Sequence, residues 1–456
     1  MAQTHTMTRG AHARAILSLG LPLVGGHVAQ FAIGLTDTIM IGWYGVPELA
    51  ALVLAQSLFM TLFLFGSGFA WAVMPMVADF DARGDEVMIR RSTRMGLWLS
   101  ILFFVAVMPL MWWSAPILRA IGQESSVAAN AQLYLRVAGW GMLPALGVMV
   151  LKNYLAGLEH TRVVFWVTVA AAFANAMANY VLIFGHLGFP ELGITGAALA
   201  SLVSHGTMLV LVAGYALRKL PDHQLFVRFW KPDWEMFGSV FRLGLPIGVT
   251  TLAEVALFAA TAVMVGWLGT VPLAAHGIAL QIATASFMVQ LGLSNAATVR
   301  ASNAQAKGDA PRLERGASVT VLLSLGVVAL ATVVFLTVPD VLMGLFVAPD
   351  DPDRAAILAV GASLLAFAAL FQLVDAMQVI HLGVLRGLQD TRVPMIIAAL
   401  AYWGVGLPAA WLFGFPLGYG APGVWFGLVL GLGVAAVLLG WRFWRHALPG
   451  QRAVAG

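Results

Sequence analysis

The chain contains no cysteine, and only 10% of its residues are charged. Without cysteine there can be no disulfide, no thiolate metal site and no cysteine nucleophile. The sequence also lacks a phosphate-binding P-loop, a histidine pair at zinc-protease spacing and a Gly-x-Ser-x-Gly motif, which argues against ATP-driven transport and two large classes of hydrolase. Soluble domains carry about 25% charged residues. Because hydrophobic residues here make up 60%, the composition indicates a polytopic membrane protein.

Long apolar stretches, separated by charged or Gly/Pro-rich breaks, predict how often the chain crosses a bilayer. A span needs about 20 apolar residues, and in lipid such a run must be helical to pair its own backbone. The strands of a membrane barrel would instead be about ten residues long with strict alternation. The predicted spans are 14–43, 49–78, 93–115, 130–156, 162–186, 193–218, 237–268, 273–303, 316–339, 354–386, 393–414 and 423–445. The predicted fold is an all-α membrane protein with twelve transmembrane helices.

The positions of lysine and arginine predict the orientation of these helices. When successive loops are assigned to alternate sides, all of the 25 Lys and Arg residues except Arg119, Arg136 and Arg354 lie on the side of the N-terminus. Positively charged loops stay in the cytoplasm, so we expect both termini to be cytoplasmic. The alternation also supports the number of spans, because one missed helix would invert every later loop.

The two halves of the chain share short motifs in the same order. LGLP at 19–22 returns at 243–246, ARGD at 82–85 is matched by AKGD at 306–309, and GLEHTRV at 157–163 by GLQDTRV at 387–393. The motifs predict two homologous six-helix bundles, 1–220 and 237–456, joined by a cytoplasmic linker at 221–236. Since six is even, the two copies enter the membrane from the same side. Parallel repeats of this kind are typical of transporters that work by alternating access.

Three acidic residues lie inside predicted spans: Asp37, Glu254 and Asp375. A charge in the bilayer core costs at least about 2.5–3.5 kcal/mol, so such residues usually face the interior of the bundle or a watery cavity. At 1.5 Å per helical residue, Glu254 lies about 18 Å in from Arg242 and Asp375 about 16 Å in from Arg386. Their matching depth predicts one shared site that binds a proton or a cation such as Na⁺.

None of these three carboxylates has an acidic counterpart in the other half. Glu254 aligns with Gln30, Asp37 aligns with Thr261, and Asp375 aligns near Ala145. The scaffold therefore tolerates neutral residues at the equivalent positions, which favours a functional role for the acids. The alternatives are a carboxylate neutralised by a neighbouring base and a protonated carboxyl that links two helices.

Asn175 and Asn179 lie one helical turn apart in the segment FANAMANY. Residues spaced i and i+4 share one face of a helix. Asn179 is near the predicted depth of Asp37, so an oxygen cage of Asp37, Asn175 and Asn179 is expected. Hydrogen bonding between helices is the alternative for the two amides.

Further residues of the predicted spans are candidates for lining a substrate cavity. An adaptable cavity favours polar groups together with aromatic and methionine side chains. For each of them, packing between helices is the alternative. These candidates are Gln30, Gln56, Gln281, Phe287, Met288, Phe371, Gln378 and His381.

Taken together, the motifs resemble those of the MATE (multidrug and toxic compound extrusion) transporters, and most closely their bacterial NorM branch. The resemblance covers essentially the whole chain. It is carried by both LGLP motifs, by TDTIMIGWYG around Asp37, by TLAEVALFAATAVMVGWLG around Glu254 and by FQLVDAMQVIHLGVLRGLQDTRVP around Asp375.

The resemblance implies two lobes in a V-shaped arrangement that export bulky, often cationic organic compounds in exchange for inward Na⁺ or H⁺. It implies that Glu254 and Asp375 form the cation site of the C-lobe, with Na⁺ or a proton as the bound ion, and that Asp37, Asn175 and Asn179 form the cation site of the N-lobe. Some members carry tyrosine around these sites, where this sequence has Phe371 and Phe287.

The remaining expectations follow from the same reading. We expect a monomer in the bacterial inner membrane with no cofactor and no nucleic-acid partner, which contacts membrane lipid and small organic drugs or cations. A lipid-linked sugar flippase of the same superfamily is the main alternative. A major-facilitator carrier is less favoured, because the loop after the second helix matches the motif of that family poorly. An intramembrane enzyme is less favoured, because the short motifs of intramembrane aspartyl proteases are not found. A channel is less favoured, because it would not need two asymmetric carboxylate sites.

Overall fold

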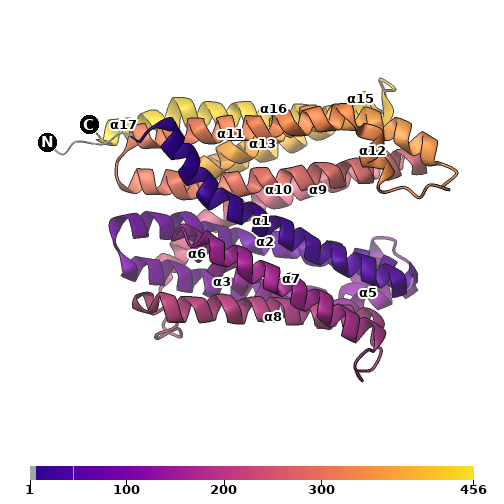
Figure 1. The fold of residues 1–456 in the computed structure, drawn as a ribbon, viewed down its shortest axis with the longest axis horizontal. Coiled ribbons are helices and arrows are strands. Elements are labelled where there is room, and N and C mark those ends of the chain that lie inside the picture. The colour runs from indigo at the N-terminus through magenta and orange to yellow at the C-terminus, as the bar shows by residue number, and fades with distance from the viewer. Residues whose placement is uncertain (1–6, 45, 456) are drawn as a thin grey trace. The chain divides into compact units, whose positions relative to one another are not determined.

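The computed structural model describes residues 7–44 and 46–455. Residues 1–6 and 456 lie outside the described part, as does Gly45, the last residue of the motif around Asp37. In the described part the chain is helical throughout, without a strand (Figure 1).

The chain divides into two compact units, 25–248 and 1–24 with 249–456. Two helices, α1 (Arg9–Tyr44) and α9 (Trp234–Gly266), each begin in one unit and end in the other. Each carries an internal proline shortly before it passes between units, Pro22 and Pro246. The first part of α1 thus belongs to the unit of the second half, and the first part of α9 belongs to the unit of the first half. The predicted division into two bundles at the linker 221–236 stays a prediction.

Unit 25–248 contains the helices that pack around α2 and α6. They are α2 (Val46–Arg83), α3 (Glu86–Trp112), α4 (Ser114–Ala120), α5 (Ser125–Ala138), η1 (Gly139–Gly141), α6 (Met142–Gly157), α7 (Thr161–Phe184), α8 (Gly193–Lys219) and η2 (Pro221–His223).

The other unit contains the helices that pack around α13. They are α10 (Thr270–Ala306), α11 (Ala310–Thr337), α12 (Pro339–Gly344), α13 (Arg354–Gly387), α14 (Arg392–Ala399), the π-helical turn η3 (Leu400–Gly406), α15 (Leu407–Gly414), α16 (Gly420–Arg442), η4 (Phe443–Ala447) and α17 (Leu448–Ala455). Figure 1 shows α10, α11, α13 and α16 side by side in this unit.

Twelve helical segments of the described part are long and apolar enough to cross a membrane, which confirms the predicted spans. The helices often extend beyond the apolar stretch. For example, α3 begins at Glu86 rather than near residue 93, because the carboxylate of Asp85 accepts a hydrogen bond from the Met88 N–H over 3.0 Å. Hydropathy detects only the apolar part of a helix, whereas such a cap fixes the residue at which the helix begins.

The repeated motifs adopt the same local structure in both halves. Gly84 and Gly308 have φ angles of 71° and 64°, and the aspartate after each caps the next helix. Glu159 and Gln389, at matched positions of the later motif, have φ angles of 63° and 58°. The motifs are therefore helix-to-helix turns, in which a left-handed residue reverses the chain.

Glycines allow the closest helix contacts. A Cβ at Gly196 of α8 would lie 2.3 Å from the Leu182 carbonyl oxygen of α7, and one at Gly427 of α16 would lie 2.1 Å from the Ala410 nitrogen of α15. At Gly383 of α13, the Ser294 side chain of α10 occupies that space and donates to the Val379 carbonyl over 2.7 Å. These contacts fix the rotation of α7, α8 and α13 about their axes, and with it the direction of their polar side chains.

Candidate functional site

Asp37, Asn175 and Asn179 lie together in unit 25–248, and the two amides direct their nitrogens rather than their oxygens to the carboxylate. The predicted oxygen cage for a cation stays a prediction. The Asp37 Oδ1 atom accepts hydrogen bonds from Asn179 Nδ2 over 2.6 Å and from Asn175 Nδ2 over 3.1 Å. All three side chains are buried. Asn175 and Asn179 share the face of α7 that meets α1, and the close contact at Gly196 brings α8 to the same place.

Two further residues of this site were not anticipated. Ser201 of α8 donates to Asp37 Oδ2 over 3.3 Å. The buried Tyr134 of α5 interacts with Ser201, and also with Gln56. A lone serine or tyrosine in an apolar span gives little signal in a sequence. Three donors thus contact the Asp37 carboxylate, and the buried Asn179 Oδ1 atom has no hydrogen-bond partner in the described part of the chain. Turning the two amides over would direct their oxygens to a cation.

Glu254 and Asp375 lie together in the other unit. Gln378, one helical turn after Asp375 on α13, donates from Nε2 to Glu254 Oε1 over 3.0 Å. Asp375 is 3% exposed and lies near enough to Glu254 for their negative charges to repel each other. Arg386 at the end of α13 interacts electrostatically with Glu254. The two membrane carboxylates of the second half therefore belong to one site.

Several buried oxygens around Asp375 have no hydrogen-bond partner in the described part of the chain: Gln372 Oε1, Asp375 Oδ1, Gln378 Oε1 and the Tyr402 hydroxyl. The first three come from successive turns of α13 and share one face. A buried acceptor without a donor costs about 1–3 kcal/mol. A bound cation, or a proton on the carboxyl, would satisfy this cluster of acceptors.

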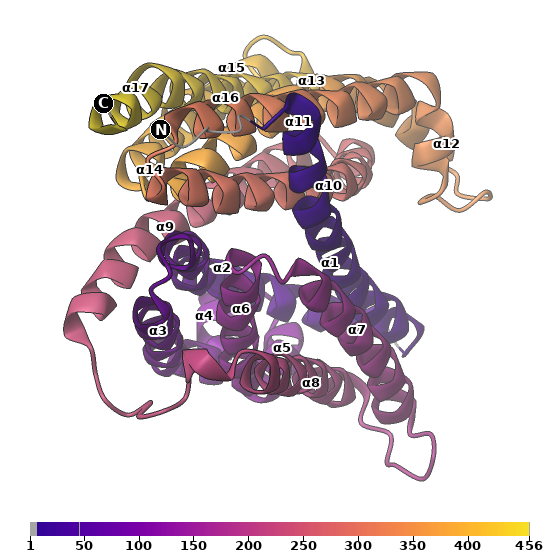
Figure 2. The ribbon, with the colours of Figure 1, turned by 60° about the vertical axis from the view of Figure 1, so that its left-hand side comes forward.

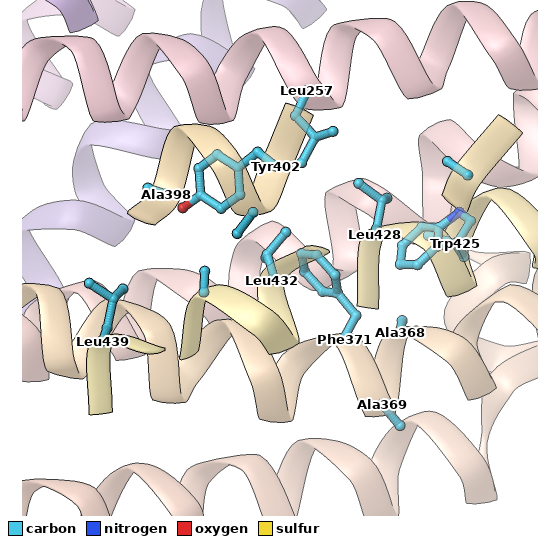
Figure 3. Packing of buried hydrophobic residues seen from close by; sticks show 14 of the residues in the cluster. Leu257, Ala368, Ala369, Phe371, Ala398, Tyr402, Trp425, Leu428, Leu432 and Leu439 are labelled. Atoms are coloured by element: carbon cyan, nitrogen blue, oxygen red, sulfur yellow. The ribbon is translucent and has the colours of Figure 1, made fainter. Parts of the chain in front are cut away.

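Tyr402 is the residue of this site that the sequence did not reveal. It lies in the π-helical turn η3, next to Trp403, whose Nε1 donates to the Ala253 carbonyl of α9 over 3.2 Å. This contact places η3 beside Glu254. Figure 3 shows Tyr402 near Leu257 of α9, and its hydroxyl interacts electrostatically with both carboxylates. Phe371 lies one turn before Asp375 and carries no hydroxyl, so Tyr402 supplies one from a different helix.

The other predicted cavity residues lie in varied surroundings. Phe371 is buried and packs edge-to-face on Phe258 and Trp425 in the core drawn in Figure 3. His381 is held by the Met377 carbonyl over 2.6 Å and by Trp444 Nε1 over 3.2 Å. Gln281 is exposed, and the remaining candidates are partly buried: Gln30, Gln56, Phe287 and Met288. Their role in lining a cavity stays a prediction.

The side-chain atoms available as ligands at the two sites are oxygens, which fit a transition-metal centre such as zinc poorly. Among the described residues no three His, Cys, Asp or Glu side chains cluster to hold a metal. Each site instead combines carboxylate, amide and hydroxyl oxygens. Hard monovalent cations and protons suit such oxygens, whereas zinc prefers nitrogen and sulfur ligands.

The sequence of the chain matches a known protein family and several curated proteins. The family model described as MatE matches residues 22–181 and 246–412, once in each half. A protein of Rhizobium meliloti called probable multidrug resistance protein NorM is 50% identical over 95% of this chain and 93% of its own length. A protein of Agrobacterium fabrum with the same name is 43% identical over 95% and 94%.

Solved structures share the fold. A MATE crystal structure in the bent conformation aligns with a TM-score of 0.88 at 20% identity, over 98% of each chain. The eukaryotic MATE transporter AtDTX14 aligns with a TM-score of 0.86 at 18% identity, over 98% of this chain and 100% of its own. The all-helical membrane fold, the paired carboxylates and these matches agree: this chain belongs to the MatE family, and it is a membrane transporter rather than an enzyme.

Proposed function

We propose that the protein is a secondary antiporter that exports bulky, often cationic organic compounds in exchange for inward Na⁺ or H⁺. The observation that carries the proposal is the row of acceptor oxygens on α13, at Gln372, Asp375 and Gln378, beside Glu254. A site rich in acceptors and poor in donors binds a cation or a proton. The names of the relatives, multidrug resistance proteins, support drugs as the exported compounds.

The paired carboxylates provide the coupling. With no bound cation, Glu254 and Asp375 repel each other, so uptake of one positive charge stabilises the site. A cationic drug and the coupling ion both favour the same negative charge and therefore compete for it. Binding of the ion drives the cycle only if the inward-facing and outward-facing states bind it unequally. Gln378 of α13 donates a hydrogen bond to Glu254 of α9, so binding or release of an ion at the site would affect the positions of both helices.

Asp37 forms a second ion site in the other unit under the same proposal. Its carboxylate already accepts three hydrogen bonds. A proton on Oδ2 would turn that oxygen into a donor toward Ser201 and leave both amides on Oδ1, whereas Na⁺ would need the amides to turn. The two sites differ in donor supply, as the lack of acidic counterparts in the repeat predicts.

We also propose that the protein lies in the bacterial inner membrane as a monomer, with both ends of the chain in the cytoplasm. The distribution of Lys and Arg supports this orientation. Both ends of the described chain lie beside α11: Arg315 donates to the Met7 carbonyl over 3.5 Å, and Arg452 pairs with Glu314 over 2.5 Å. These contacts support placing the two ends on the same side of the membrane.

The experiment is ion-driven drug uptake into proteoliposomes by the wild type, Glu254→Gln and Asp375→Asn. We expect the ion-driven flux of each variant to be at least about tenfold lower than that of the wild type. The amide side chain that replaces each carboxylate can neither exchange a proton nor balance the charge of a cation. Two exposed acids, changed by Glu191→Gln and Asp350→Asn, are matched controls. Wild-type flux from both site variants would refute the proposal.

The coupling ion and the alternative activities are separated in the same vesicles. A Na⁺ gradient at constant pH and a pH gradient without Na⁺ are imposed in turn. Drug flux that responds to only one gradient identifies the ion. Drug flux that responds to neither, with transfer of a lipid-linked sugar across the bilayer, would favour the flippase instead.

A further inference from the structure

The connection between α8 and α9 is bound to α3. Arg94 of α3 donates from Nη2 to the Val227 carbonyl over 2.6 Å, and Trp98 Nε1 donates to the Phe229 carbonyl over 2.9 Å. Figure 2 shows the pink connection passing beside α3 before it rises into α9. The predicted linker is thus a structured surface at the end of a membrane helix.

Two acidic residues anchor the far end of this connection. Arg91 pairs with Asp233 and also binds Glu235 over 3.1 Å. Asp233 in addition accepts the Met236 N–H over 3.1 Å, which caps the start of α9. The hydrogen bond from Arg91 holds the pKa of Asp233 below its usual value, so its carboxylate stays ionised in the physiological range. Both acids are therefore engaged by Arg91.

A cavity of about 640 Å³ opens between α3 and the connection. We call it the linker cavity. Its lining contains two acidic residues, the Asp233 and Glu235 already named, and five basic residues: Arg90, Arg91, Arg94, Arg228 and Lys231. Apart from Arg91, none of these bases forms an ion pair in the described part of the chain. The Arg94 Nε atom is buried and has no hydrogen-bond partner there.

Aromatic residues around the linker cavity mark the level of the membrane surface. Trp230 and Trp234 are 76% and 69% exposed, and Val227 is 52% exposed. Tryptophan is enriched where lipid headgroups meet the hydrocarbon. Exposed aromatic residues that alternate with basic ones are therefore expected to lie in the headgroup layer, with the cavity opening at that depth.

We propose that the linker cavity binds the headgroup phosphate of an anionic phospholipid. The guanidinium groups of Arg90 and Arg94 supply donors from α3, and Arg228 and Lys231 supply charge from the connection. Arginine matches phosphate with paired N–H donors, and basic pockets at helix ends favour anionic headgroups. The exposed tryptophans place the ligand in the membrane rather than in solution. A lipid bound there holds the connection against α3.

The test measures lipid binding by the purified full-length protein, with phosphatidylglycerol and phosphatidylcholine of identical acyl chains. We expect the wild type to prefer phosphatidylglycerol, and Arg228→Gln with Lys231→Gln to lower its affinity for that lipid about tenfold. The matched control changes Arg218 and Lys219 to glutamine; they are exposed at the end of α8 and lie outside the cavity. The control should keep the preference.

Three results would overturn the proposal. They are equal binding of the two lipids by the wild type, an unchanged preference in the cavity variant, and binding of free glycerol phosphate as tight as that of the lipid. The last result would assign the cavity to a soluble phosphate compound. Since no transport is measured, failure here leaves the antiport proposal standing, and failure of antiport leaves the lipid site standing.

Discussion

Gln378 of α13 donates a hydrogen bond over 3.0 Å to Glu254 of α9, so an amide joins the two helices that carry the membrane carboxylates of the second half. Its own Oε1 has no partner in the described part of the chain. The amide therefore offers one contact to the carboxylate and one to a bound cation.

Replacing this amide should weaken ion coupling. Gln378→Leu removes a hydrogen bond to a charged group, worth about 1.5–3 kcal/mol, and one ligand oxygen. We expect the ion concentration that gives half-maximal drug flux to rise about tenfold or more. Gln123→Leu, at an exposed position in the loop after α4, is the control. An unchanged ion dependence in Gln378→Leu would remove this residue from the site.

The hydroxyl of Tyr402 should contribute to the same site. Tyr402→Phe keeps the ring that packs in the core and removes only the unpartnered oxygen. If that oxygen holds the ion, its loss should raise the half-maximal ion concentration about fivefold, while the melting temperature stays the same or rises. Tyr419→Phe, 62% exposed, is the matched control. A lower melting temperature with unchanged ion dependence would show a purely structural hydroxyl.

The contacts of Asp37 predict a graded series. The donor distances increase from Asn179 at 2.6 Å through Asn175 at 3.1 Å to Ser201 at 3.3 Å. We expect Asp37→Asn to abolish most ion-driven flux, and Asn179→Leu, Asn175→Leu and Ser201→Ala to reduce it in that order, because a longer hydrogen bond contributes less. Initial uptake rates at saturating drug give the series. A reverse order would contradict it.

The contact between α15 and α16 should tolerate no added side chain at Gly427. A Cβ there would lie 2.1 Å from backbone of Ala410, so Gly427→Val must separate the helices. We expect a loss of about 3 kcal/mol, seen as a lower thermal midpoint in detergent. Gly326→Val on α11 meets open space and is the control. Equal midpoints for the two variants would contradict the close approach.

The connection between α8 and α9 should loosen in acid. Burial lowers the pKa of His223, whose Nδ1 lies 2.5 Å from the Tyr154 hydroxyl. A histidine whose folded pKa is depressed contributes stability that is present above its ordinary pKa near 6.5 and is lost as pH falls below it. The protection of the amides of residues 220–232, taken as the intrinsic exchange rate relative to the observed rate at each pH, should therefore fall from pH 8 to pH 5. In His223→Gln this pH dependence should disappear, and its persistence would assign it elsewhere.

Much of the architecture follows from composition alone. The twelve spans were predictable because lipid forces an apolar, self-paired backbone, and the three membrane acids were conspicuous because charge is costly there. The helix turns were recognisable as repeats, since Gly84 and Gly308 occupy the same left-handed position.

The partners within each site were not predictable in the same way. The sequence gives the depth of Glu254 but not the direction in which its helix faces. That rotation is decided where helices touch, at residues such as Gly196 and Gly383, which look ordinary in an apolar segment. Tyr402 and Ser201 entered the sites for this reason. Local solvation thus determined where the helices and charges lie, and only interhelical packing decided which groups meet them.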